Sequence, residues 1–118
     1  MCAFHRDDNQ RLCVDGLSLA DITARYGSPL YAYSGSGITE AFTQFQAAVA
    51  PVSGKVHFAM KANSAIGVLA LIGRLGGGMD IVSLGELARA QAAGIDPADV
   101  VFSGVGKTDD DIRHALTC

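Results

Sequence analysis

The chain has 118 residues, a length that fits one domain or part of a larger one and excludes a multidomain protein. Nine Lys and Arg against twelve Asp and Glu give a net charge of -3, and there is no basic run long enough to neutralise a phosphate backbone. Nucleic acid is therefore not an expected partner. Hydrophobic residues make up 49% and charged residues 18%, which predicts a folded chain with a buried core.

Membrane insertion, secretion and metal binding are also not expected. The longest apolar run, residues 65–73, is far shorter than the roughly 18 to 20 residues that span a bilayer. The first residues lack the apolar centre of a secretory signal. Cys2, Cys13 and Cys118 show neither a CxxC spacing nor a His at zinc-finger distance. These features predict a cytoplasmic protein with no membrane contact, whose reduced thiols have no assigned role.

Residues 1–17 have weak periodicity, so we expect them to be irregular or extended. Ser18 is expected to cap a short helix, since apolar side chains follow at helical spacing up to Tyr26. Gly27 can then adopt the left-handed conformation that ends a helix.

Residues 29–33, with alternating tyrosines, predict a strand. A second helix is expected over residues 36–50, because Phe42 and Phe45 belong to an apolar face that recurs every three or four residues. Pro51 is expected to end this helix.

From residue 55 onward a strand, a helix and a glycine-rich return repeat. The strands begin near residues 56, 79 and 100, which are 23 and 21 residues apart, the length of one βα unit. Helices are expected over 64–75, 84–93 and 108–116, the last with Thr108 and Asp111 in an acidic capping box. The pattern predicts an α/β fold with a parallel sheet. Three strands alone would leave apolar edges exposed, so we expect the first βα units of a (β/α)8 barrel.

Parallel strands bring the segments that follow them to one face, where ligands bind in such folds. Lys61 lies at the end of the first of these strands, on the side of His57 and Ala59, so its stem is expected to point into an apolar interior. Such a lysine can be paired, neutralised or used as an amine that forms a Schiff base. The alternative is a lysine that bends out to solvent at the strand end, and the spacing leaves both interpretations open.

Three other polar residues near this face have ordinary structural interpretations. His57 is expected to be a hydrogen-bonded core residue. Asp80 can pair with Lys61 across the sheet or accept hydrogen bonds from the glycine-rich turn, and the sequence does not decide between them. Glu86 lies in the first turn of a helix, where the helix dipole favours an acid without any further role.

Two glycine-rich segments are not predicted to bind phosphate. Residues 104–108 read Gly-Val-Gly-Lys-Thr, but a P-loop requires a glycine where Val101 stands. Residues 76–78 precede a strand instead of opening a helix, so they are expected to form a tight return loop.

Several short sequence motifs, which we call the family words, occur together in the order that is typical of a known family. The words are Phe-Ala-Met-Lys-Ala-Asn at 58–63, the segment 78–94 with Ser-Leu-Gly-Glu-Leu-Ala-Arg-Ala, and Val-Phe-Ser-Gly-Val-Gly-Lys-Thr at 101–108. They resemble the pyridoxal-phosphate-dependent decarboxylases of the alanine racemase-like fold, and among these the diaminopimelate decarboxylase family. The N-terminal words near residues 15 and 26–31 also fit, so the resemblance covers roughly residues 12 to 116.

The resemblance implies a cofactor, a reaction and site residues. Lys61 matches the lysine that holds pyridoxal 5'-phosphate covalently, so it is the expected catalytic residue, and Lys61 with Asp80 are the expected cofactor-binding residues. Asp80 and Glu86 both match acidic positions on the active-site side. The implied reaction converts meso-2,6-diaminopimelate to L-lysine and CO2 in lysine biosynthesis, with a small amino acid as substrate and a homodimer as the assembly. No residue up to Cys118 is assigned to the distal end of the substrate.

The resemblance also implies that the chain is an N-terminal fragment, since family members are several times longer. Residues 1–34 are then an N-terminal segment that packs with a missing C-terminal β domain, and 35–118 are the first part of the cofactor-binding barrel. The 118-residue chain alone is expected to be inactive. The alternatives are a fragment of an ornithine- or arginine-type decarboxylase, and a noncatalytic chain that only associates with a full-length subunit.

Overall fold

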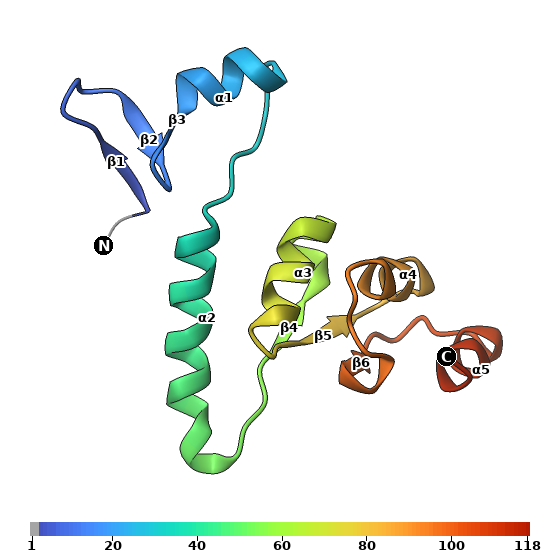
Figure 1. Ribbon diagram of the computed structural model, residues 1–118. Coiled ribbons are helices and arrows are strands. Elements are labelled where there is room, and N and C mark those ends of the chain that lie inside the picture. Colours follow the sequence, from blue (N-terminus) through green and yellow to red (C-terminus); the bar gives the residue numbers. More distant parts are fainter. Residues whose placement is uncertain (1–2) are drawn as a thin grey trace. The chain divides into compact units, whose positions relative to one another are not determined.

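The computed structural model describes residues 3–118, so Cys2 lies outside the described residues. By its contacts the chain divides into two compact units, Met1–Ala41 and Phe42–Cys118 (Figure 1). The predicted boundary between residues 34 and 35 falls at the start of a helix, whereas this division falls inside it. The assignment of the two segments to separate domains stays a prediction.

The first unit opens with a small antiparallel sheet. Strands β1 (Phe4–Arg6), β2 (Leu12–Val14) and β3 (Leu17–Ser18) pair in the order β1-β2-β3. The helix α1 (Leu19–Tyr26) follows directly. Cys13 and Val14, each 4% exposed, are the buried apolar side chains of this sheet. Residues 1–17 were expected to be irregular or extended; in their described part, from residue 3 on, the chain is extended and pairs as an antiparallel meander.

The helix α1 forms where it was predicted, although its start differs from the prediction. Ser18 occupies the N-cap position in extended geometry, but its side chain makes no cap hydrogen bond, so the predicted side-chain cap is wrong. Its Oγ is buried without a partner within the described chain, because Ser18 is also the last residue of β3. At the other end, Gly27 has the expected positive φ, 85°, and its N–H donates to the Thr23 carbonyl.

The strand predicted for residues 29–33 is absent from the structure, which places no helix or strand between Gly27 and Ser34. The tyrosines that suggested it are exposed, Tyr31 by 89% and Tyr33 by 54%. Strand propensity reflects packing against neighbouring strands. Without such packing, the alternation in the sequence does not become a strand.

Helix α2 (Gly35–Val49) matches the predicted helix and continues into a 3₁₀ turn, Ala50–Val52, that contains Pro51. The N-terminus of α2 is capped by Ser34, whose Oγ accepts the Gly37 N–H at 2.9 Å. Asp15 in turn accepts the Ser34 hydroxyl at 2.8 Å and the Ser36 hydroxyl. These hydrogen bonds, that of the Ser36 hydroxyl above all, lower the pKa of Asp15 below its ordinary value.

The second unit contains the predicted parallel sheet. Strands β4 (His57–Ala59), β5 (Gly78–Ile81) and β6 (Val100–Phe102) pair in the order β4-β5-β6, and both pairs are parallel. Helices α3 (Ile66–Arg74) and α4 (Leu84–Ala92) make the two connections, with a 3₁₀ turn, Pro97–Asp99, before β6. Helix α5 (Asp109–Leu116) follows β6. The predicted α/β fold is therefore confirmed, strand by strand and helix by helix.

One face of this sheet carries the core. The register pairs Phe58 with Met79 and Ile81 with Phe102, which places these four side chains on the same face. Met79 and Ile81 are fully buried, as is Met60 just after β4. They are joined in the core by Leu69 and Ile72 of α3, and by Leu87 and Ala90 of α4.

Two helices of the second unit begin with side-chain caps, of which the sequence predicts the one at Thr108 and not the one at Ser83. Thr108 and Asp111 form the expected capping box, in which the Thr108 Oγ1 accepts the Asp111 N–H and the Asp111 carboxylate accepts the Thr108 N–H. Ser83 caps α4 by accepting the Glu86 N–H at 3.2 Å. Within residues 3–118, none of the helices is long and apolar enough to cross a membrane.

Candidate functional site

The sheet face opposite the core collects the polar residues of the candidate site. His57 pairs in register with Gly78, and Ala59 pairs with Asp80, so these four residues share one face. A Cβ at Gly78 would lie 2.5 Å from both the Asp99 carbonyl oxygen and the His57 Cδ2. The His57 ring therefore occupies the space that the missing side chain leaves. No hydrogen bond of this imidazole is found among the described residues, so the expected hydrogen-bonded core histidine is instead a half-buried packing residue.

Asp80 is the one member of this face with a fully buried, unsatisfied side-chain oxygen among the residues that the structure describes. Its Oδ1 is buried and has no hydrogen-bond partner. Neither predicted partner, the Lys61 ammonium or the glycine-rich turn, contacts it. A buried carboxylate oxygen without a donor costs free energy. Such an atom is a site at which a ligand group can donate a hydrogen bond.

Lys61 lies two residues beyond Ala59, the register partner of Asp80. The strand ends at Ala59, and the chain turns into a 3₁₀ segment, Met60–Ala62, closed by the Asn63 N–H to the Met60 carbonyl at 3.1 Å. The side-chain alternation of the strand stops there, and Lys61 is exposed. Of the two interpretations that the sequence left open, the structure agrees with the lysine that turns out to solvent at the strand end, because the strand period does not continue into the turn.

Lys61 also differs from the other two lysines of the chain. Lys55 forms an ion pair with Asp99. Lys107 donates to the Ser103 carbonyl at 3.1 Å and to the Gly104 carbonyl at 2.6 Å, and its ammonium lies 5.2 Å from the Phe102 ring centre. No ion pair or side-chain hydrogen bond of Lys61 is found in residues 3–118. Its amine is thus the lysine nitrogen left available for a ligand.

Glu86 has the structural role that the sequence suggested. Its Oε2 accepts the Val82 N–H at 2.7 Å, and its own N–H donates to the Ser83 Oγ. These bonds fix the corner between β5 and α4, directly after the strand that carries Asp80. Glu86 therefore positions the backbone at this end of the sheet.

The loop over residues 104–107 is closed by its own lysine. The Lys107 ammonium donates to the carbonyls of Ser103 and Gly104 at the start of the loop and lies over the ring of Phe102, the last residue of β6. A P-loop uses its lysine on phosphate instead. The structure therefore agrees with the sequence argument against a P-loop.

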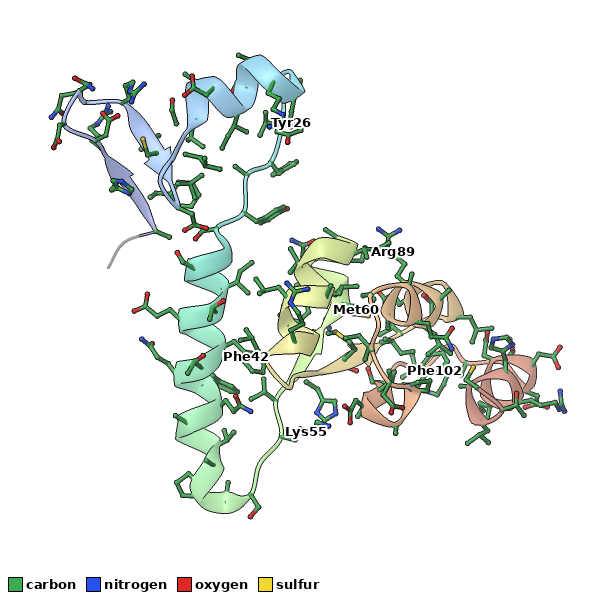
Figure 2. All side chains as sticks on the ribbon, viewed as in Figure 1. Tyr26, Phe42, Lys55, Met60, Arg89 and Phe102 are labelled. Atoms are coloured by element: carbon green, nitrogen blue, oxygen red, sulfur yellow. The ribbon has the colours of Figure 1, made fainter. Side chains whose placement is uncertain are left out.

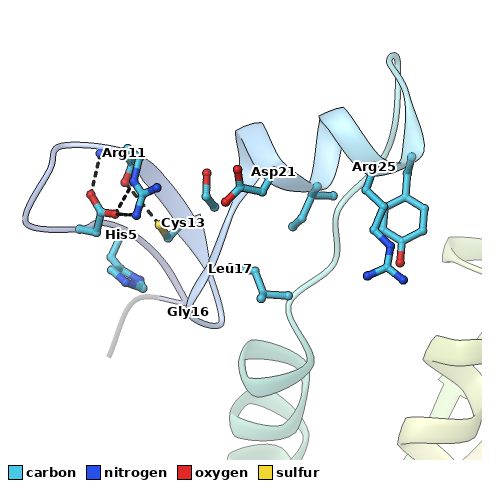
Figure 3. A pocket seen from close by; sticks show the side chains of 11 residues that line it. His5, Arg11, Cys13, Gly16, Leu17, Asp21 and Arg25 are labelled. Atoms are coloured by element: carbon cyan, nitrogen blue, oxygen red, sulfur yellow. Dashed lines mark hydrogen bonds and ion pairs between the residues drawn. The ribbon is translucent and has the colours of Figure 1, made fainter.

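Two cavities that the sequence analysis did not anticipate lie in the first unit. One, of about 320 Å³, opens between the small sheet and α1, and Figure 3 shows its charged lining. There Arg11 pairs with Asp7, and the Arg25 guanidinium lies over the Tyr26 ring. The second cavity, of about 370 Å³, is lined by apolar and tyrosine side chains together with Asp15. Neither cavity includes Lys61 or Asp80.

The comparison with family models decides where the chain belongs. Residues 36–118 match the model described as pyridoxal-dependent decarboxylase, pyridoxal binding domain. The chain belongs to this decarboxylase family. The match includes both Lys61 and Asp80 and all three parallel strands.

Individual relatives of this decarboxylase family are longer than the chain. It is 52% identical over 105 residues to the diaminopimelate decarboxylase of Pseudomonas aeruginosa, covering 89% of the chain and 25% of that relative. The crystal structure of AQ1208 from Aquifex aeolicus aligns at a TM-score of 0.88 and 37% identity, covering 98% of this chain and 28% of the other. The diaminopimelate decarboxylase of M. jannaschii in complex with L-lysine aligns at 0.90 and 27% identity, over 98% of this chain and 28% of that one. The chain thus spans about a quarter of the length of these relatives.

Proposed function

We infer that this chain provides the cofactor-anchoring part of a pyridoxal-phosphate-dependent decarboxylase that converts meso-2,6-diaminopimelate to L-lysine and CO2. The observation that carries the inference is the accessibility of the Lys61 amine. It is exposed just beyond β4, while Lys55 and Lys107 are bound to other groups of the chain. The 52% identity to a diaminopimelate decarboxylase supports the choice of substrate.

Lys61 and Asp80 fit the chemistry of the proposed cofactor. An amine free of ion pairs needs only to lose a proton to attack an aldehyde, and it gives up no salt bridge on doing so. The unpartnered Asp80 Oδ1, on the strand beside that of Lys61, can accept a hydrogen bond from a bound cationic or N–H group. We propose that Lys61 holds pyridoxal 5'-phosphate covalently and that Asp80 lines the cofactor site.

The chain's own residues then have three tasks in the proposed reaction. Lys61 would hold the cofactor through its amine. Asp80 presents its unpartnered carboxyl oxygen at a fixed position on the sheet, and Glu86 keeps the end of β5 in place through the Val82 N–H. The bound cofactor supplies an acceptor for the electron pair released when the carboxylate leaves as CO2.

The anchoring role is tested by chemical trapping. The chain is incubated with pyridoxal 5'-phosphate, reduced with borohydride and digested, and the peptides are weighed by mass spectrometry. We expect the cofactor mass on the peptide that contains Lys61, and we expect Lys61→Ala to lose that mass. Lys55→Ala is the matched control, since it removes another lysine of the same unit and should leave the labelling of Lys61 unchanged.

The trapping experiment has a clear contrary result. Labelling of Lys55 or Lys107 in preference to Lys61 would overturn the assignment. Unfolding monitored by circular dichroism should be nearly the same for Lys61→Ala as for the original chain, because an exposed side chain with no partner contributes little to stability.

Substrate choice is tested separately by a chimera. Discrimination between diaminopimelate and ornithine requires a group that binds the second carboxylate, and such groups can discriminate by a factor of about 10⁴. We propose that this group lies outside residues 1–118. Grafted onto the rest of an ornithine decarboxylase, the chain should then give an enzyme that prefers ornithine. A hybrid that prefers diaminopimelate would instead place specificity within this chain.

The proposal includes three further properties that were predicted from the sequence or from the family resemblance. They are a homodimeric assembly, a cytoplasmic location, and no decarboxylase activity of the 118 residues alone. The last has a physical reason, since a covalent anchor gives the cofactor no orientation unless its ring and phosphate are also held. CO2 release from the purified chain above the rate with free cofactor would contradict it.

A further inference from the structure

Arg89 connects the two parts of the candidate site. It lies in the last turn of α4, the helix that follows the strand of Asp80, and Figure 2 shows it extending from that helix. Its Nε donates to the Ser64 carbonyl oxygen at 2.8 Å. Ser64 is only three residues after Lys61. The hydrogen bond therefore joins α4 to the segment that carries the reactive amine, across 25 positions of sequence.

The Ser64 carbonyl is free for this bond because of how α3 begins. The Val68 N–H donates to the Ala65 carbonyl at 2.9 Å. In a helix that began one residue earlier, this N–H would bind the Ser64 carbonyl instead. Asn63 Oδ1 meanwhile accepts the Ala65 N–H at 3.0 Å and shapes the turn into the helix. A guanidinium donor on a free carbonyl is a charge-assisted hydrogen bond, one of the stronger kinds.

The Lys61 segment is thus held at two points. On one side, Met60 is 0% exposed and fixes the start of the 3₁₀ turn in the core. On the other side, Arg89 fixes the Ser64 carbonyl to α4, whose own position is set by the buried Leu87 and Ala90. Lys61 lies between these two points, and no side-chain hydrogen bond or ion pair of it is found within the described part of the chain. Its orientation depends on them.

We propose that Arg89 is a positioning residue for Lys61: its hydrogen bond to Ser64 holds the turn so that the Lys61 amine is presented to the cofactor. This inference rests on the proposed function of Lys61. It assigns Arg89 no contact with the cofactor. Loss of the hydrogen bond is expected to reduce the reaction of Lys61 and to leave the other lysines as reactive as before.

A matched pair of substitutions separates the hydrogen bond from the bulk of the side chain. Arg89→Gln places an amide nitrogen at the same position along the side chain as the arginine Nε, so the donor is kept without the charge. Arg89→Met has a chain of similar length and no donor. Arg74→Ala is the control, since Arg74 is also in the last turn of its helix and no side-chain hydrogen bond of it is found in residues 3–118.

The readout is the rate at which pyridoxal 5'-phosphate and borohydride label Lys61, divided by the rates for Lys55 and Lys107 in the same sample. A general loss of stability would change all three rates, whereas a positioning effect changes the ratio. Arg89→Met should lower the ratio about threefold to tenfold, and Arg89→Gln should recover most of it. Arg74→Ala should leave the ratio unchanged.

Each contrary outcome has a distinct meaning. If the original chain is not labelled at Lys61, the proposed function fails and this inference fails with it. A second outcome is that the original chain is labelled at Lys61, but Arg89→Met keeps the labelling ratio or lowers it no more than Arg89→Gln does. The positioning role of Arg89 is then wrong, while the anchoring role of Lys61 stands. A loss equal in Arg74→Ala would also overturn the positioning role.

Discussion

The two units of the chain are stabilised by different interactions. In Phe42–Cys118 the fully buried side chains Met60, Leu69, Met79 and Ile81 form an apolar core beneath a parallel sheet. In Met1–Ala41, Leu17 is 62% exposed and Tyr26 is 69% exposed. Polar contacts, such as the hydrogen bonds of Asp15 with two serines, stabilise the structure of this unit. Burial of apolar area is the larger source of stability. The candidate site therefore lies in the unit that has the larger buried apolar core.

The largest contrast between the units is expected from removing apolar side chains. Ile81→Ala opens a cavity in the core and should lower the free energy of unfolding by about 2–5 kcal/mol. Leu17→Ala removes a side chain that is 62% exposed and should change it by less than about 0.5 kcal/mol. Denaturant unfolding followed by far-ultraviolet circular dichroism measures both. Equal losses of unfolding free energy would mean that apolar side chains of the first unit are shielded from solvent as well as those of the second.

A smaller effect is expected from filling the space beside His57. The Cβ of Gly78→Ala would lie 2.5 Å from a backbone carbonyl, so strand β5 must shift, at a cost of about 1–3 kcal/mol. Gly67→Ala is the control in α3, where a new Cβ meets nothing within 4 Å. It should be neutral or slightly stabilising, because alanine favours a helix. If thermal unfolding is the same for both variants, the close approach at Gly78 is not a constraint.

A smaller difference still is expected between two serines that precede helices. Ser83→Ala removes the cap of α4 and should cost about 1 kcal/mol. Ser18→Ala removes a hydroxyl that caps nothing and is buried without a partner, so stability should stay the same or rise. Chemical denaturation of the two variants decides the comparison. A loss at Ser18 as large as that at Ser83 would show that its hydroxyl has a partner in solution.

The second unit was predictable from the sequence because its signals are local and agree with one another. Strand starts, glycine returns and the Thr108–Asp111 spacing all indicate the same βα repeat, and each lies within a few residues of the structure it predicts. The site was predictable only in part. Lys61 and Asp80 come from the family words, but the exposure of Lys61 depends on the strand ending at Ala59.

The remaining features depend on contacts that no local pattern encodes. Arg89 and Ser64 are 25 positions apart and meet only because α3 and α4 pack together. The strand predicted at 29–33 failed for the opposite reason, since its local pattern is good but the structure gives it no neighbouring strand among the described residues. Alternation alone does not supply a sheet.

The smallest expected effect is a pH dependence in the first unit. Hydrogen bonds from Ser36 and Ser34 lower the pKa of Asp15 below its ordinary value of 3.8. The folded carboxyl thus binds its proton less readily than the unfolded one. The stabilisation is complete above about pH 4 and is lost as the pH falls through the lower folded pKa. Hydrogen exchange of the Gly37 amide, at the Ser34 cap, should accelerate relative to the unfolded chain as acid is added.

Two variants test that assignment. Asp15→Asn should remove the acid dependence of Gly37 exchange, because the group that titrates is gone. Asp8→Asn, at an exposed position of the same unit, should preserve it. An unchanged pH profile in Asp15→Asn would place the titrating group elsewhere.

The unpartnered Oδ1 of Asp80 has a consequence for engineering. A buried oxygen without a donor lowers stability, so the position is not optimised for folding. Replacement of Asp80 by a residue of similar size without this unmet oxygen is expected to give a more heat-resistant chain that retains the cofactor less well. Directed evolution for thermal tolerance alone would therefore tend to remove Asp80, whereas selection for the proposed cofactor binding would keep it.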